Sequence, residues 1–141
     1  MQRPIIRGVA LLGLLFSASC ARQRTIDGDG LRSDLTAGIS LASETSLYLQ
    51  YALEGRTTQS FSKGHLHYLA EEAGRTKKEL EQSVSSPAEG ANLQQTCLQF
   101  EALAQELTSI TQKSSDPNAL TSSMHRMNEI GKAMEKIKGS L

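Results

Sequence analysis

Apolar residues recur every three or four positions from Ser33 to the end of the chain, and this spacing limits the fold more than any other feature of the sequence. A period near 3.6 residues places apolar side chains along one face of an α-helix. Turn and cap signals divide the pattern into four runs. The sequence therefore predicts four helices, over residues 34–54, 60–84, 87–113 and 117–138.

Local signals mark the boundaries of these helices. Gly55 is a natural stop for the first helix, because glycine is common just after helix ends. Ser86 and Pro87, followed by Glu89, have the pattern of an N-cap, a first helical residue and a capping box. Asp116 and Pro117 repeat the cap-then-proline pattern. If the turn over residues 55–60 were helical instead, the first two helices would fuse and three helices would result.

The composition agrees with helices rather than with a sheet. The chain has two valines, three phenylalanines, three tyrosines and no tryptophan, whereas sandwiches and barrels depend on β-branched and aromatic residues. We predict an all-α, up-down-up-down four-helix bundle. In the second helix, the predicted apolar stripe comprises Phe61, Leu66, Leu69, Ala73, Leu80 and Val84. Fifteen basic residues balance fifteen acidic residues, so there is no basic field that would attract nucleic acid.

Residues 1–19 have the three zones of a secretory signal peptide. Arg3 and Arg7 give the start a positive charge, and an uninterrupted run of apolar or small residues follows over 8–16. That run is too short to cross a hydrocarbon core, which needs roughly 20 residues. We therefore expect a cleaved leader rather than a retained transmembrane helix.

The end of this leader resembles the lipobox of bacterial lipoproteins. Small residues, Ser17, Ala18 and Ser19, come directly before Cys20. The resemblance implies that diacylglycerol is attached to the Cys20 sulfur and that the leader is cleaved before Cys20. With Ala21 rather than aspartate next in the chain, it also implies a lipid anchor in the outer membrane, with the domain facing the periplasm. Ordinary cleavage after Ala21 would instead release a periplasmic or secreted protein.

Residues 20–33 are predicted to be the lipidated cysteine and a flexible linker, because they carry mixed charge and little to bury. Within this segment, "DGDG" at 27–30 looks like the start of a calcium loop. However, Leu31 stands where the third oxygen ligand would be needed, and no glutamate follows at the required position. The linker interpretation is therefore preferred. The bundle itself is assigned to residues 34–141.

Few residues point to chemistry. Cys97 lies on the apolar stripe of the third helix and is interpreted as a core residue; a reactive thiol, or a disulfide with Cys20, is the alternative. Two pairs with four-residue spacing could each supply two metal ligands: His67 with Glu71, and His125 with Glu129. No histidine has the Glu-x-x-His spacing of di-iron bundles, so we predict no resident metal or cofactor. Nucleophile and phosphate-loop motifs are also missing, and we expect no catalysis.

The remaining signal is an excess of apolar residues in "LYLQYALEGR" at 47–56. Leu47, Tyr48 and Tyr51 widen the apolar surface beyond one stripe, and Arg56 follows in the turn. Such a surface is either buried in the bundle or covered by a partner. We expect a membrane-anchored envelope protein that acts as an adaptor or accessory subunit for a protein partner. The alternatives are a haem- or metal-binding bundle that uses His65, His67 or His125, and a periplasmic sensor of a small ligand.

Overall fold

The computed structural model describes residues 23–113 and 115–141. Four helices make up most of this part of the chain, and the ends of two loops form a small strand pair. The bounds are β1 Arg24–Ile26, α1 Gly28–Leu53, α2 Gln59–Glu81, β2 Ser83–Ser85, α3 Gly90–Lys113 and α4 Pro117–Ser140. The predicted leader and the lipidation site, residues 1–20, lie outside the described residues.

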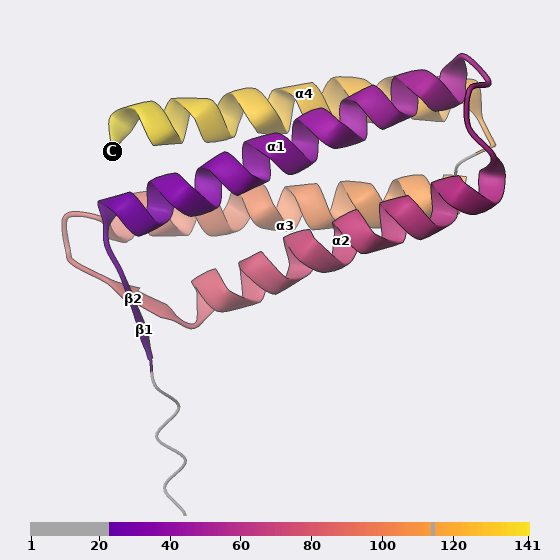
Figure 1. The fold of residues 1–141 in the computed structure, drawn as a ribbon. Helices are drawn as coiled ribbons and strands as arrows, with labels where there is room; N and C mark the ends of the chain where they lie inside the picture. The colour runs from indigo at the N-terminus through magenta and orange to yellow at the C-terminus, as the bar shows by residue number, and fades with distance from the viewer. Residues whose placement is uncertain (1–22, 114) are drawn as a thin grey trace, which may run out of the picture.

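The four helices run alternately up and down the long axis of the bundle (Figure 1). Helix α1 packs most extensively on α4, and α2 on α3, while α3 joins these two pairs by packing on α4. Contact between α1 and α2 is much less extensive, although the two are consecutive. The predicted all-α, up-down-up-down four-helix bundle is confirmed. Among the described residues, no helix is both long enough and apolar enough to cross a membrane.

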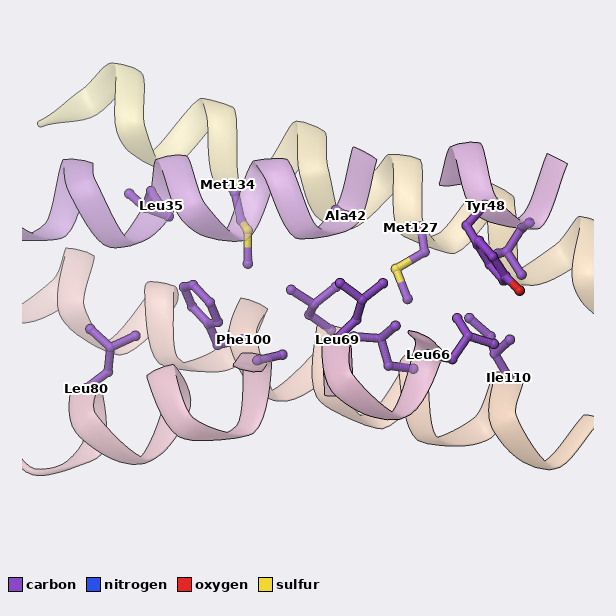
Figure 2. Close-up of a cluster of buried hydrophobic side chains, with 14 of the residues drawn as sticks. Leu35, Ala42, Tyr48, Leu66, Leu69, Leu80, Phe100, Ile110, Met127 and Met134 are labelled. Carbon is purple, nitrogen blue, oxygen red and sulfur yellow. The ribbon is translucent and has the colours of Figure 1, made fainter. Parts of the chain in front are cut away.

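One apolar core runs the length of the bundle. It is built from every helix and is rich in leucine; the largest fully buried side chains are Phe100, Leu31, Leu35, Leu49, Leu66, Leu69, Leu80, Leu103, Leu107, Ile110, Met127 and Met134. Figure 2 shows that Phe100 on α3 and Met134 on α4 point into the same part of this core. Burial of these side chains is the main source of stability for a helical domain of this size.

Helix α1 approaches its neighbours most closely at Gly38. A Cβ atom at this position would lie 2.6 Å from the Met134 Sδ and 2.8 Å from the Phe100 Cζ. Both distances are shorter than van der Waals contact. Because the side chain of glycine is a single hydrogen atom, α1 can pack tightly against α3 and α4 at this position.

The predicted flexible linker over residues 20–33 is wrong for the part that the structure describes. Residues 24–26 form a strand that pairs in parallel with β2, with Arg24 opposite Ser83 and Ile26 opposite Ser85. Asp27 then caps α1, since its Oδ1 accepts a hydrogen bond of 2.8 Å from the Gly30 amide. The "DGDG" segment is therefore the start of a helix: its first aspartate makes an N-cap, which outweighs the weak helix propensity of two glycines.

The predicted boundaries on either side of β2 also need correction. Helix α2 ends at Glu81 rather than at 84, because Ser83–Ser85 pair with β1 instead of continuing the helix. Pro87 lies in a turn closed by a hydrogen bond of 3.0 Å from the Glu89 amide to the Ser86 carbonyl. Helix α3 therefore begins at Gly90, and the capping box expected at Ser86 does not form.

The start of α4 lies where the cap-then-proline pattern indicates. Asp116 accepts a hydrogen bond of 3.0 Å from the Asn118 amide, and Pro117 is the first helical residue.

An ion pair joins α4 to α3. Arg126 of α4 donates two hydrogen bonds, of 2.6 and 2.7 Å, to the Glu106 carboxylate of α3. Burial alone would raise the pKa of Glu106, but hydrogen bonds from Arg126 and Ser123 outweigh it and hold that pKa below its ordinary value. This bidentate pair fixes α4 against α3.

Candidate functional site

A hollow of about 510 Å³ opens between the end of α1 and the start of α2. It lies at the end of the bundle opposite the β1–β2 pair, beside the turn that joins the two helices (Figure 1). Most of its lining is aromatic or aliphatic. The lining residues are Glu44, Leu47, Tyr48, Tyr51, Arg56, Thr57, Thr58, Phe61 and His65. We call this feature the α1–α2 hollow.

One side of the α1–α2 hollow comes from a single flank of α1. Leu47 and Tyr48 each lie three or four residues from both Glu44 and Tyr51, so these four side chains share one flank of the helix. Tyr48 forms the floor: it is only 7% exposed, and its hydroxyl lies 3.2 Å from the Thr57 Oγ1 in the turn. Leu47 is 49% exposed at the rim. The buried Tyr48 ring therefore forms the base of this side, and the exposed Leu47 side chain forms its edge.

The other side comes from the first turns of α2. Thr58 is the N-cap, and its hydroxyl accepts a hydrogen bond of 3.4 Å from the Phe61 amide. Phe61 and His65, one turn apart, stack with their rings 7° from parallel and their centroids 5.9 Å apart. The Tyr48 ring lies 5.2 Å from His65 and 6.3 Å from Phe61, both tilted. These separations lie in the range of favourable aromatic pairs, so the three rings support one another.

Two polar pairs stand at the rim. The His65 Nε2 lies 3.0 Å from the Glu44 Oε1 and joins α2 to α1. The Arg56 guanidinium lies 5.1 Å above the Tyr51 ring, and one of its nitrogens bonds Glu54 at 3.1 Å. Hydrogen bonds from Gln50 and from Arg56 lower the pKa of the Glu54 carboxyl. Both pairs place polar groups around an apolar centre, the usual composition of a binding site.

Three exposed apolar side chains, Leu47, Tyr51 and Phe61, line the α1–α2 hollow. Among the described residues, the large hydrophobic side chains that remain exposed are Leu47, Tyr51, Leu53, Phe61, Tyr68, Val84 and Leu98. Five of these belong to the last turns of α1 or to α2. Phe61 is the most exposed of them, at 63%. A contiguous group of exposed apolar side chains is typical of surfaces that contact another molecule.

The four residues predicted to bind a partner meet at this place. Leu47, Tyr48, Tyr51 and Arg56 all line the α1–α2 hollow, although Tyr48 is the floor rather than a contact surface. Partner binding itself stays a prediction. The sequence pattern missed Phe61 as a surface residue, since the predicted core stripe of α2 included it. The buried face of α2 is set by Ser62, Leu66, Leu69, Ala73 and Leu80, and Phe61 lies one position off that face.

The candidate metal ligands do not converge. His67 and Glu71 form an exposed pair on α2, with 3.3 Å between Nε2 and Oε1. His125 and Glu129 lie exposed on α4. Within residues 23–113 and 115–141, no three histidine, cysteine, aspartate or glutamate side chains come together as a metal site would require.

Cys97 packs against the core from α3 and is half-buried. Burial raises the pKa of its thiol, and the nearby Glu81 charge acts in the same direction. A raised pKa reduces the thiolate fraction, which is the opposite of what a reactive cysteine requires. The alternative disulfide with Cys20 falls outside the described residues.

Two other depressions are less suited to a ligand. One, of about 560 Å³, lies between α3 and α4 over the Glu106–Arg126 pair. A smaller one, of about 270 Å³, lies where α1 crosses Gly131 of α4. Neither is lined by aromatic side chains. The α1–α2 hollow therefore stands out by the aromatic groups that line it.

Comparison of this chain with protein-family models, with curated proteins and with solved structures finds no match. Function is therefore argued from the geometry and chemistry of the site itself.

Proposed function

We propose that this protein is a bacterial envelope lipoprotein, anchored to a membrane through Cys20, whose helical bundle is a binding module without catalysis. The α1–α2 hollow is the observation that carries the proposal. It holds exposed aromatic and aliphatic groups on two helices with a charged rim. Tyrosine and arginine are among the side chains that most often dominate binding energy at protein interfaces.

The partner that fits this surface is a segment of another envelope protein. Such a segment would insert a leucine or aromatic side chain between Leu47 and Phe61, which form the open edges of the hollow. A carboxylate beside that side chain would meet the Arg56 guanidinium, which is largely exposed above Tyr51. An apolar anchor beside a charged contact is the usual arrangement of an interface hot spot.

A small-molecule sensor is the second candidate function. The volume of the hollow, about 510 Å³, lies in the range of pockets that hold small ligands. Its wide opening towards solvent favours a protein segment, because a small ligand is normally enclosed on most sides. Tight binding of a small apolar compound by the purified protein, with chemical shift changes confined to the hollow, would favour the sensor.

The anchor is tested by substituting its attachment site. We expect Cys20→Ser to abolish incorporation of labelled palmitate in a diderm bacterial host and to move nearly all of the protein from the membrane fraction to the soluble fraction. Two or three acyl chains hold a protein stably, whereas none leaves only weak surface contacts. Cys97→Ser is the matched control and should stay acylated and membrane-bound. Continued acylation of the Cys20→Ser protein would show that the lipid is attached elsewhere.

The docking surface is tested by crosslinking in the native cell. A photoreactive residue in place of Phe61 should give a discrete adduct with one envelope protein, because this side chain is at the edge of the hollow. The same residue in place of Leu98, which is similarly exposed on α3, should give none. Adding Leu47→Glu to the Phe61 probe should reduce the adduct at least tenfold without changing thermal stability. Equal yields from both positions, or an adduct that survives Leu47→Glu, would contradict docking at the hollow.

A further inference from the structure

The distance from the proposed anchor to the folded domain is short. Cys20 and Arg24 are four positions apart, and a fully extended chain covers at most about 3.5 Å per residue. The start of β1 can therefore stand no more than roughly 14 Å from the acylated residue.

The strand β1 is firmly part of the bundle. It pairs with β2 over its whole length, and the Ile26 side chain is buried in the core. Arg24 adds contacts to two helices, at 3.2 Å to Asp34 of α1 and 3.6 Å to Glu79 of α2. These contacts join the first described residues to one end of the bundle, where α2 ends and α3 begins (Figure 1).

The α1–α2 hollow lies at the opposite end. Twenty residues of α1 separate Gly28, beside β1, from Tyr48 on the floor of the hollow. At a rise of 1.5 Å per residue, that separation is about 30 Å.

The surface around the hollow does not favour a lipid bilayer. Glu44 lines the hollow beside His65, and Arg56 at the rim bonds the carboxylate of Glu54, so the residues that line the hollow form no basic cluster that would attract anionic headgroups. The end that carries β1 exposes charged groups of both signs, such as Arg24, Asp29 and Glu81, and Val84 of β2 is 44% exposed there.

We propose that the β1–β2 pair orients the anchored bundle so that its β1 end faces the membrane and the α1–α2 hollow faces away from it. The occupant of the hollow is then a protein segment that stands in the aqueous space, about 30 Å or more from the lipid surface. This orientation rests on the proposed anchor at Cys20. It deepens the proposed function by placing the partner away from the bilayer.

Energy transfer to labelled lipid tests the orientation. The acylated full-length protein, in a Cys97→Ser background, carries a donor dye on either Ser86→Cys, beside β2, or Ser60→Cys, beside the hollow. Both serines are exposed, so the two labels are matched. The proteins are added to preformed vesicles of phosphatidylethanolamine and phosphatidylglycerol that contain an acceptor on the headgroup. We expect transfer from position 86 to be several-fold more efficient than from position 60.

A spacer variant supplies the control. Twenty glycine and serine residues inserted between Arg22 and Gln23 add an average reach of about 25 Å. Transfer from position 86 should then fall towards the value for position 60. Equal or greater transfer from position 60 in the protein without the spacer would overturn the orientation and indicate that the hollow rests on lipid. Protein that does not bind the vesicles would instead overturn the anchor, and the orientation with it.

Discussion

Phe100→Ala should lower the free energy of unfolding by about 3–5 kcal/mol. Phe100 is the largest side chain with no exposed surface, and it lies among core residues of α1 and α4 (Figure 2). Removing the ring loses its transfer free energy and leaves a cavity that rigid helices on three sides cannot fill. Urea unfolding, followed by circular dichroism at 222 nm, measures the change directly.

Leu98→Ala is the matched control for this prediction. It lies two positions away on the same helix, and its side chain is 55% exposed. We expect a change of about 0.5 kcal/mol or less, since exposed substitutions away from special features rarely cost more. Comparable losses for Phe100→Ala and Leu98→Ala would mean that the core is not centred on Phe100.

Gly38→Ala should destabilise the bundle by about 1–3 kcal/mol, although alanine is the better helix former. The new methyl group would lie within 3 Å of the Met134 Sδ and of the Phe100 Cζ. Both of these side chains are fully buried, so neither can move aside without disturbing its own neighbours. The same urea experiment applies.

Gly74→Ala is the control of opposite sign. Gly74 is also within a helix, but a Cβ atom there meets nothing within 4 Å. We expect stabilisation by about 0.5–1 kcal/mol from helix propensity alone. A double variant should show the origin of the Gly38 effect: Phe100→Leu makes room, so Gly38→Ala should cost less in that background. If Gly38→Ala stabilised the protein as Gly74→Ala does, α1 would not pack as closely as described.

The helices themselves could be predicted because each has its own apolar period, and α4 begins where Asp116 and Pro117 indicate. The equivalent signal at Ser86 and Pro87 gave the wrong start for α3. A helix cap contributes only about 1 kcal/mol to stability. Here the pairing of residues 83–85 with β1 outweighs the preference of Ser86 and Pro87 for starting a helix. No pattern within either segment reveals that two distant three-residue stretches will pair.

The sequence indicated the α1 side of the α1–α2 hollow but not the α2 side. The excess of apolar residues at Leu47, Tyr48 and Tyr51 is visible within one helix, because it exceeds what a single buried face requires. Phe61 and His65 belong to the next helix, and their place depends on how α2 is rotated about its axis. A shift of one position moves a side chain by 100°, which is enough to take Phe61 from the core to the rim.

The parallel pairing of β1 with β2 has a consequence for the order of folding. During synthesis the N-terminal part of the chain leaves the ribosome first. Strand β1 is therefore exposed long before β2, because α1 and α2 lie between them in the sequence. Until both helices have emerged and turned back, β1 has an unpaired edge on each side, open to pairing with another chain. Closing this long-range contact carries a loop entropy cost, which is lower once α1 and α2 are packed in the bundle. The strand pair is therefore expected to form late, as the step that joins the start of the domain to its middle.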